Sequence, residues 1–283
     1  VAPYVTIPLG YGVIFQGIVA ENMTANGMPI EMIEVWPHTI ILGAGMLVGL
    51  IGSWWFFRKP RDYQDISLEG ISLEDEAIRL NKDHIVSLIA IAGVLFGQLY
   101  WDSMPLGALL GILIMIIGGA VKLRNSDGTI AEGIRLMGMV SFIMLIAGGY
   151  AYVVNQTGAV DTLIDATLAI LGASKVVFVI VLIIIGLLIT MGIGTSFGTI
   201  PVIALFYVPM CMKMNMSVGA TACLIACAAA LGDAGSPASD STLGPTSGLN
   251  ADGQHDHIWD TCVPTFFFYN LPLAIAGFIG GMI

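Results

Sequence analysis

Charged residues are scarce in this sequence, and basic residues are the scarcest. Only 11% of the 283 residues are charged, whereas a soluble domain has about 25%. Lys and Arg number 10 against 20 acidic residues, giving a formal net charge of −10. With no basic surface to neutralise phosphates, the chain is not expected to bind nucleic acid. Together with 57% hydrophobic residues, the low charge also argues against a soluble enzyme and a disordered chain.

Cysteine is rare as well, with four residues and no CxxC pair. Cys223 and Cys227 stand four apart in the apolar stretch ATACLIACAAA, where small hydrophobic residues let helices approach closely. We interpret them as packing residues in preference to a disulfide or metal site. No Ser-His-Asp or Cys-His arrangement is supported, so no enzyme activity is expected.

The sequence does contain long apolar runs, many near the length that crosses a bilayer as a helix. They cover residues 37–57, 85–101, 104–121, 136–154, 175–192, 199–212, 217–231 and 263–283. These runs predict an all-α polytopic membrane protein. The basic residues gather in two loops, around 58–84 and 122–135, and the positive-inside rule places both loops in the cytoplasm of a plasma-membrane protein.

An internal repeat is visible at an offset of 226 residues, where Ala25-Asn26-Gly27 lines up with Ala251-Asp252-Gly253. On that offset the Pro/Gly-rich stretch 3–12 falls opposite the similar stretch 232–237. Two interrupted hydrophobic segments in corresponding positions are the best sequence pointer to the binding site of a secondary transporter. The alternative is a chance match of a few residues.

The repeat predicts the organisation of the chain. Residues 1–57 would end a first inverted repeat, 58–84 would form a cytoplasmic linker, and 85–283 would form the second repeat. Within that repeat we expect scaffold spans at 85–121, a hairpin at about 175–212, a broken helix at about 217–250 and a last span at 263–283. The chain starts with Val1 and lacks a signal peptide, so an N-terminal truncation of roughly 140–150 residues is expected if the repeats are equal.

The densest polar cluster is LGDAGSPASDST, residues 231–242, directly after an apolar helix. Pro and Gly break the helix there and free backbone groups. Asp233 and Asp240 supply negative charge, and Ser236, Ser239, Ser241 and Thr242 supply neutral oxygens. Hard cations such as Na⁺ prefer such oxygen ligands, and a carboxylate inside the membrane marks an ion or proton path. The alternative is a surface loop rich in Gly, Ser and Asp.

A second cluster, MGIGTSFGTIP at residues 191–201, lies between two short apolar stretches. We interpret it as the tip of a re-entrant hairpin, since non-helical backbone is tolerated at membrane depth only where it is buried or lines a cavity. The alternative is a kink in one long helix. His255 and His257 form an HxH pair, for which an interfacial loop is favoured over a metal site.

GDAGSPASDST, followed by a short acidic loop, resembles the GD-x-x-SP-x-SDT signature of NhaC-type sodium/proton antiporters in the ion transporter superfamily. GTSFGT upstream resembles the hairpin tip of the same family, and APYVTIPLGYGVIFQGIVAENMTANGMPI resembles its first-repeat break. The resemblance implies an elevator-type transporter with two inverted repeats, each holding a re-entrant hairpin and a discontinuous helix. It also implies a homodimer formed through a scaffold, which we place at 85–121.

Carried over onto this sequence, the family's cation site falls on two segments. The broken helix would contribute Asp233, Ser236, Ser239, Asp240 and Thr242, with Asp233 and Asp240 as the Na⁺ carboxylates. The hairpin tip would contribute Thr195, Ser196 and Thr199. Two departures, Ala234-Gly235 in place of a charged or bulkier polar residue and Ser241 in place of Thr, leave the substrate open.

The expected function is Na⁺/H⁺ antiport, with no cofactor beyond the transported ions. The alternative is a sodium- or proton-coupled symporter of an amino acid such as histidine, or of a carboxylate. An antiporter needs a carboxylate that binds Na⁺ and H⁺ competitively, whereas a symporter would use the same residues for Na⁺ alone. A passive channel or a structural membrane subunit would leave the two matched breaks unexplained.

Overall fold

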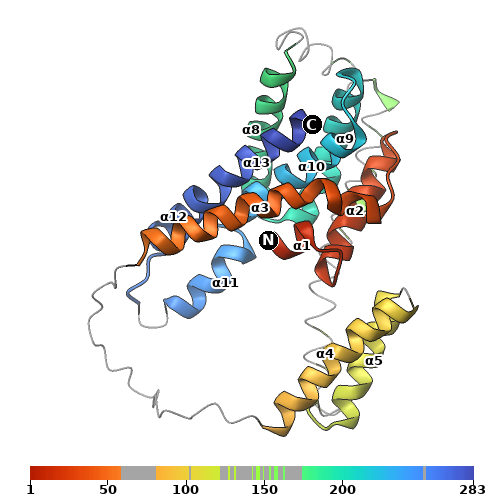
Figure 1. Cartoon of the computed structure of the whole chain (residues 1–283), viewed down its shortest axis with the longest axis vertical. Coiled ribbons are helices and arrows are strands. Elements are labelled where there is room, and N and C mark those ends of the chain that lie inside the picture. The colour runs from red at the N-terminus through yellow and green to blue at the C-terminus, as the bar shows by residue number, and fades with distance from the viewer. Residues whose placement is uncertain are drawn as a thin grey trace. The chain divides into compact units, whose positions relative to one another are not determined.

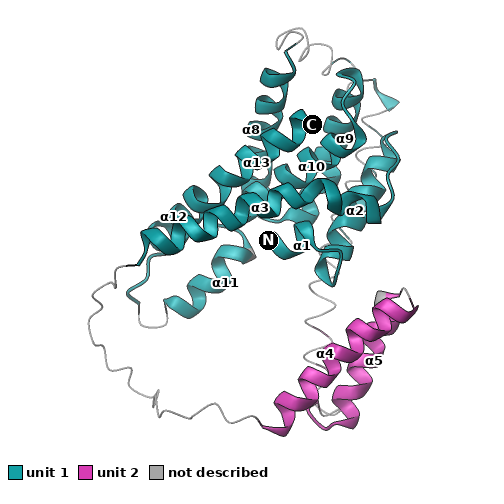
Figure 2. Cartoon of the chain, in the orientation of Figure 1, with its two compact units in different colours: residues 1–66, 142–283 teal, residues 67–141 magenta. Residues whose placement is uncertain are grey.

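The computed structural model describes residues 1–58, 81–121 except 102, 174–250 and 253–283, with isolated positions between 122 and 173. The regular secondary structure of the described residues is all helical, with no strand, which confirms the predicted all-helical fold for this part of the chain. The chain divides into two compact units, residues 1–66 with 142–283 and residues 67–141 (Figure 2). The predicted span 136–154 and most of the linker 58–84 fall outside the described residues.

The larger unit is a bundle of long and short helices (Figure 1). In chain order they are α1 (Ala2–Thr6), α2 (Tyr11–Ala25), α3 (Met32–Phe56), α8 (Lys175–Ile193), α9 (Ser196–Lys213), α10 (Val218–Asp233), α11 (Asp240–Leu249), η2 (His257–Cys262), α12 (Val263–Thr265), η3 (Phe266–Asn270) and α13 (Leu271–Met282). The two η segments are π-helical turns within one continuous helix from His257 to Met282.

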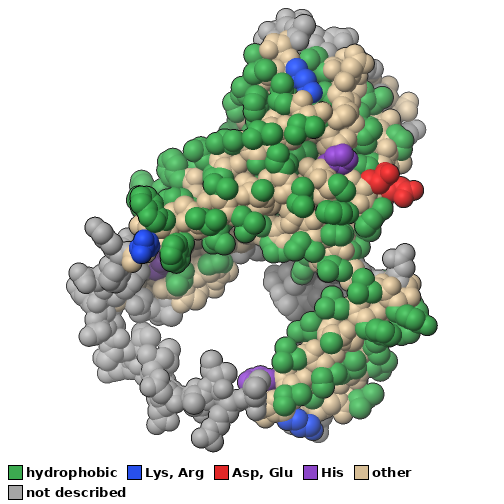
Figure 3. Space-filling model, in the orientation of Figure 1, with side chains coloured by type: hydrophobic (Ala, Val, Ile, Leu, Met, Phe, Trp, Pro, Cys, Tyr) green, Lys and Arg blue, Asp and Glu red, His purple; other side chains and the backbone are tan. Residues whose placement is uncertain are grey.

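Five helices of the described residues are long and apolar enough to cross a membrane: Met32–Phe56, Lys82–Trp101, Lys175–Ile193, Ser196–Lys213 and His257–Met282. Their outward faces carry large apolar side chains, among them Leu47, Ile51 and Leu188, each more than half exposed. Hydrophobic side chains accordingly cover much of the visible surface (Figure 3). Such a surface fits a lipid environment and identifies a multi-pass membrane protein.

The core of the larger unit is α10, in which every residue from Gly219 to Asp233 is buried. Helices α3, α8, α9 and α13 pack around it. A Cβ added at Gly277 would lie 2.2 Å from Cys227 Sγ, and one at Gly280 would lie 2.3 Å from Cys223 Sγ. Both cysteines are buried and unbridged, so their predicted role in close helix packing is confirmed.

The first Pro/Gly-rich stretch is an interrupted helix, as its composition predicts. Helix α1 ends at Thr6, Ile7 is extended, and Gly10 adopts φ +58° before α2 begins. A Cβ at Gly12 would lie 1.7 Å from the carbonyl oxygen of Ile7, so glycine is required there. The carbonyl of Val5 accepts a hydrogen bond from the Thr39 hydroxyl of α3 at 2.7 Å, which pairs a backbone group near the break.

The second polar stretch is interrupted in a comparable way. Helix α10 ends at Asp233, and α11 begins at Asp240 after the non-helical residues 234–239. The Ser239 hydroxyl caps α11 by accepting from the backbone N–H of Ser241 at 3.1 Å. Both segments matched in the sequence are therefore discontinuous helices. Whether they belong to inverted repeats stays a prediction.

A sharp turn joins α8 to α9 in the predicted hairpin region. Gly194 closes α8 in the left-handed conformation at φ +76°, Thr195 is extended, and α9 starts at Ser196. A left-handed residue at a helix end favours glycine because a side chain would clash with the backbone. Two helices of 19 and 18 residues thus meet at one Gly/Ser/Thr turn.

The smaller unit contains the antiparallel pair α4 (Lys82–Trp101) and α5 (Met104–Ile117) (Figure 2). These helices occupy most of the predicted scaffold range 85–121, and α4 begins before it, at Lys82. A Cβ at Gly97 would lie 2.7 Å from the Cα of Gly107, and one at Gly111 would lie 2.3 Å from Val94. Small residues therefore set the approach of the two helices. The homodimer predicted for this range stays a prediction.

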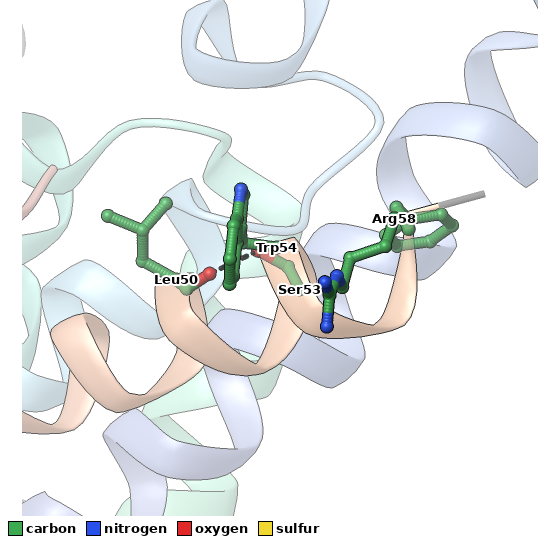
Figure 4. A pocket seen from close by; sticks show the side chains of 5 residues that line it. Leu50, Ser53, Trp54 and Arg58 are labelled. Atoms are coloured by element: carbon green, nitrogen blue, oxygen red, sulfur yellow. Dashed lines mark hydrogen bonds between the residues drawn. The ribbon is translucent and has the colours of Figure 1, made fainter. Parts of the chain in front are cut away.

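A pocket at the C-terminal end of α3 is lined by Leu50, Ser53, Trp54, Phe57 and Arg58 (Figure 4). The Arg58 guanidinium lies 5.3 Å from the centroid of the Trp54 ring, and the Ser53 hydroxyl donates to the Leu50 carbonyl at 2.9 Å. A tryptophan stacked with an arginine at the end of an apolar helix is typical of the membrane–water boundary. This pocket therefore fits an anchor for α3 and not a transport site.

Candidate functional site

The carboxylate of Asp233 is the centre of the candidate site. Asp233 is the last residue of α10 and only 7% exposed. Its two oxygens accept hydrogen bonds from four hydroxyl groups, two on each oxygen. A carboxylate has about four lone-pair positions, so these four donors satisfy it fully. Without them a buried charge would cost several kcal/mol.

Oδ2 of Asp233 is held by residues from two distant segments. The Tyr4 hydroxyl of α1 donates at 2.5 Å and the Ser196 hydroxyl of α9 at 2.6 Å. The two hydroxyl oxygens are 3.0 Å apart. Tyr4 is positioned by ring packing, with Phe15 at 5.3 Å and Phe197 at 5.5 Å between centroids. The first broken helix and the hairpin tip are thus joined through one carboxylate.

Oδ1 of Asp233 is held by residues that follow it across the break. The Ser239 hydroxyl donates to Oδ1, and the Ser241 hydroxyl donates to it at 2.9 Å. Ser196 is the first residue of α9, and Ser239 caps the N-terminus of α11. The positive N-terminal ends of α9 and α11 therefore lie next to this carboxylate.

The other predicted site residues hold the surrounding backbone in place. The Ser236 hydroxyl donates to the Met191 carbonyl at 3.0 Å, which ties the break to α8. The Thr242 hydroxyl donates to the Ser236 carbonyl at 2.5 Å, and the Thr199 hydroxyl donates to the Thr195 carbonyl at 2.6 Å. These three hydroxyls therefore donate to backbone carbonyls and not to the Asp233 carboxylate. Asp240 begins α11, and its side chain lies outside the described residues.

The hairpin tip packs directly against the second break. A Cβ at Gly194 would lie 3.0 Å from the Ala238 carbonyl oxygen, and one at Gly232 would lie 2.3 Å from the backbone of α8. The Thr190 hydroxyl donates to the Ala228 carbonyl at 2.8 Å. Glycines on both sides allow this approach, which brings Ser196 within reach of Asp233.

A chain of hydrogen bonds runs from the loop after α11 to the break. His257 Nε2 lies 2.9 Å from the Pro237 carbonyl oxygen, and its Nδ1 lies 2.8 Å from the Thr246 hydroxyl. Thr246 in turn contacts Thr261 at 2.9 Å, and Thr261 contacts His255 Nε2 at 2.7 Å. Because a carbonyl only accepts, Nε2 of His257 must carry a proton. The HxH pair is therefore connected to the break through the hydrogen bond from His257 to the Pro237 carbonyl.

Sodium suits this donor set better than a transition metal. The described residues contain no group of three or more His, Cys, Asp or Glu side chains able to hold a metal ion. The oxygens around Asp233 come from one carboxylate and several hydroxyls, which are ligands for hard cations. The histidines of the HxH pair are engaged with threonine hydroxyls and a carbonyl.

One side of the carboxylate network is open. Ser196 and Ser239 are fully buried, whereas Ser241 is exposed. Ser241 also lines a cavity of about 420 Å³. Its other lining residues are Val1, Ala2 and Pro3, the apolar Met46, Leu47 and Leu50 of α3, and Ala234, Thr265 and Tyr269. A small solute in this cavity would reach the network through Ser241.

Sequence reasoning missed two residues of this region. Tyr4 was not singled out, although it contacts Asp233 across 229 positions of sequence. Asn270 is the second: it lies in FFFYN within an apolar span, and its side chain is buried beside the break. A polar residue alone in an apolar span is a signal that could have identified Asn270.

A multi-pass helical membrane protein in which two discontinuous helices and a hairpin meet at a buried carboxylate has the features of a membrane transporter. The model of the Na⁺/H⁺ antiporter family matches residues 1–278. The chain belongs to this family, which confirms the resemblance seen in the sequence.

Curated relatives match almost the entire chain. A protein of Bacillus subtilis named "Putative amino acid transporter YuiF" is 45% identical over 289 residues, covering 100% of this chain and 64% of the relative. An uncharacterized membrane protein of Vibrio parahaemolyticus is 45% identical over 287 residues, covering 100% of this chain and 65% of the relative. This chain thus spans less than two thirds of their length. No solved structure matches it significantly.

Proposed function

We propose that this chain forms the cation-binding part of a secondary active transporter that exchanges Na⁺ for H⁺ across the plasma membrane. The observation that carries the proposal is Asp233, a buried carboxylate whose four described partners are all hydroxyl groups. Na⁺ and H⁺ compete for such a group because each neutralises the same charge. Serine and tyrosine hydroxyls can donate to the free carboxylate and turn their lone pairs toward a bound cation.

Coupling follows from that competition. Because a free carboxylate is costly at membrane depth, the loaded forms, with Na⁺ or H⁺, are favoured for movement across the bilayer. An elevator-type movement would carry the hairpin and the broken helices together, since Asp233 bonds to α1, α9 and α11. Asp240 is proposed as a second Na⁺ carboxylate, and the pair α4–α5 as the dimer surface.

A second candidate function is sodium- or proton-coupled symport of an amino acid or a carboxylate. The cavity of about 420 Å³ that contains Ser241 favours it, because a lone cation needs far less space. The name of the Bacillus subtilis relative points the same way. In this scheme Asp233 binds only the coupling ion.

Fluorescence of a ΔpH dye in everted vesicles tests the proposal, with the protein expressed from its complete reading frame in an antiporter-deficient host. After respiration builds the gradient, NaCl should collapse it in the wild type and not in Asp233→Asn. Asp83→Asn is the matched control, because Asp83 is exposed in the first turn of α4. Well-expressed wild type that shows no sodium-dependent collapse would contradict the antiport proposal.

A further inference from the structure

Asn270 is the most unusual polar residue of the described structure outside the Asp233 network. It ends the π-helical turn η3 and is only 2% exposed. Neither its Nδ2 nor its Oδ1 has a hydrogen-bond partner in the described part of the chain. The remaining buried side-chain atom without a partner there is Oε1 of Gln16. Both polar ends of a single side chain are thus left unpaired.

An unpaired buried amide is expensive, so its presence calls for a reason. Leaving a buried donor or acceptor unsatisfied costs about 1–3 kcal/mol. Leucine has nearly the same shape and would suit an apolar span without that cost. Helix stretches of the π type, where an extra residue enters the turn, occur frequently at functional sites. An amide placed there is therefore better explained by a ligand than by packing.

The amide lies against the second break. A Cβ at Gly235 would lie 2.7 Å from Asn270 Nδ2 and 3.1 Å from the Cα of Phe266. The φ of Gly235 is not positive, so the glycine is required by space and not by its backbone conformation. Gly235 is two residues from Asp233. The amide of η3 therefore packs against the short non-helical segment that begins directly after Asp233.

The neighbours of both residues line the same cavity. Ala234 precedes Gly235 and Tyr269 precedes Asn270, and both line the cavity of about 420 Å³. Ser241, which donates to Asp233, and Thr265 line it as well. Asn270 itself does not line this cavity, so contact with a solute held there would require η3 to shift.

The two unpaired atoms of Asn270, Nδ2 and Oδ1, indicate the class of ligand. A carboxamide presents an N–H donor and a C=O acceptor side by side. A metal ion alone would satisfy Oδ1 and leave Nδ2 unpaired, and a simple anion would do the reverse. A ligand with a carboxylate next to an ammonium group satisfies both. We infer that Asn270 binds the α-carboxylate and α-ammonium groups of a zwitterionic substrate beside the cation at Asp233.

This inference rests on the proposed cation site at Asp233, but it does not depend on the direction in which protons move. Gly235, against which the Asn270 amide packs, is two residues along the chain from Asp233. A substrate carboxylate bound by this amide would therefore lie in the electric field of a cation bound at Asp233. Binding of the cation and of the zwitterion would then be mutually favourable, which is what coupled transport requires.

Thermal unfolding of the purified protein, expressed from its complete reading frame, is the first test. Each standard L-amino acid is added in turn at fixed NaCl, with succinate as a ligand that only accepts and ethylammonium as one that only donates. At least one amino acid should stabilise the wild type, and the two single-function ligands should not. If no amino acid raises the midpoint, or if succinate does so equally well, the inference is wrong.

Asn270→Leu separates ligand binding from structure. Without ligand this variant should be as stable as the wild type or more stable, because an unpaired amide is removed. The concentration of the stabilising amino acid that half-saturates this variant should be about tenfold or more above that of the wild type. Asn22→Leu is the matched control, since the Asn22 amide already donates to the Ile18 carbonyl at 2.8 Å; it should keep amino acid binding. Equal amino acid affinity in Asn270→Leu and the wild type would overturn the inference.

Gly235→Ala is a second variant that leaves Asn270 unchanged. Its methyl group would displace the amide and weaken amino acid binding, whereas Gly244→Ala has open space around its Cβ and should not. Sodium/proton exchange is measured on the same preparations. Exchange without amino acid binding defeats this inference and leaves the proposed function standing, whereas sodium-dependent amino acid binding without exchange defeats antiport and supports the inference.

Discussion

The Tyr4 hydroxyl offers the sharpest test of the Asp233 network. It donates to Asp233 Oδ2 at 2.5 Å, and its ring packs against Phe15 and Phe197. Tyr4→Phe removes the oxygen and keeps the ring. A hydrogen bond to a charged group contributes about 1.5–3 kcal/mol, so the free energy of unfolding should fall by about that amount.

Tyr11→Phe is the matched control for this change. Tyr11 also packs near Phe197, at 6.2 Å between ring centroids, but it is 64% exposed. Its replacement should change the free energy of unfolding by no more than about 0.5 kcal/mol. Equilibrium unfolding in mixed micelles of mild detergent and dodecyl sulfate measures both variants under one condition.

The effect of Tyr4→Phe should also depend on its partner. In an Asp233→Asn background, Tyr4→Phe should lower the free energy of unfolding by only about 0.5–1.5 kcal/mol, the range of a neutral hydrogen bond. The reduction is expected because a hydrogen bond to an ionised acceptor is stronger than one to a neutral amide. The described network would be refuted if Tyr4→Phe lowered the free energy of unfolding no more than Tyr11→Phe does, or by the same amount in the Asp233→Asn background as in the wild type.

Three further predictions concern the packing that supports the site. Gly12→Ala should destabilise the protein by roughly 1–3 kcal/mol, because its Cβ would lie 1.7 Å from a carbonyl oxygen; Gly17→Ala on the same helix has open space and should be neutral or stabilising by up to about 1 kcal/mol. Gly107→Leu should force α4 and α5 apart, since its Cβ would lie 2.7 Å from the Val94 carbonyl; unchanged amide hydrogen exchange in both helices would contradict this packing. His257→Phe removes the donor to the Pro237 carbonyl, so amide exchange at residues 234–239 should accelerate, whereas the exposed Trp259 can be changed to Phe without that effect.

The sequence was informative where local chemistry decides the structure. Long apolar runs predicted the helices, and Pro and Gly at residues 3–12 and 232–237 predicted the two interruptions. Gly194 similarly marked the turn between α8 and α9. Each of these signals acts within a few residues, so no knowledge of tertiary contacts is needed to interpret it.

The sequence was uninformative where distant segments meet. Asp233 stood out as a carboxylate in an apolar context, but Tyr4 is joined to it by packing between α1 and the start of α9, which no local pattern encodes. Ser236, Thr242 and Thr199 have the same residue types as Ser196 and Ser239, yet their hydroxyls donate to backbone carbonyls and not to the carboxylate. The Ser196 hydroxyl lies near both, 3.0 Å from the Ala229 carbonyl oxygen and 2.6 Å from Asp233 Oδ2. The residue type shows which side chains could contact the carboxylate, but only the fold determines which of them reach it.

The hydrogen bonds of Asp233 also constrain how the protein can move. They link α1, the start of α9 and both halves of the second broken helix. These segments are therefore expected to move together as long as the four hydrogen bonds are intact. Neutralising the charge weakens all four links at once. Because all four hydrogen bonds end on one side chain, a single substitution at Asp233 should loosen the contacts between these segments together.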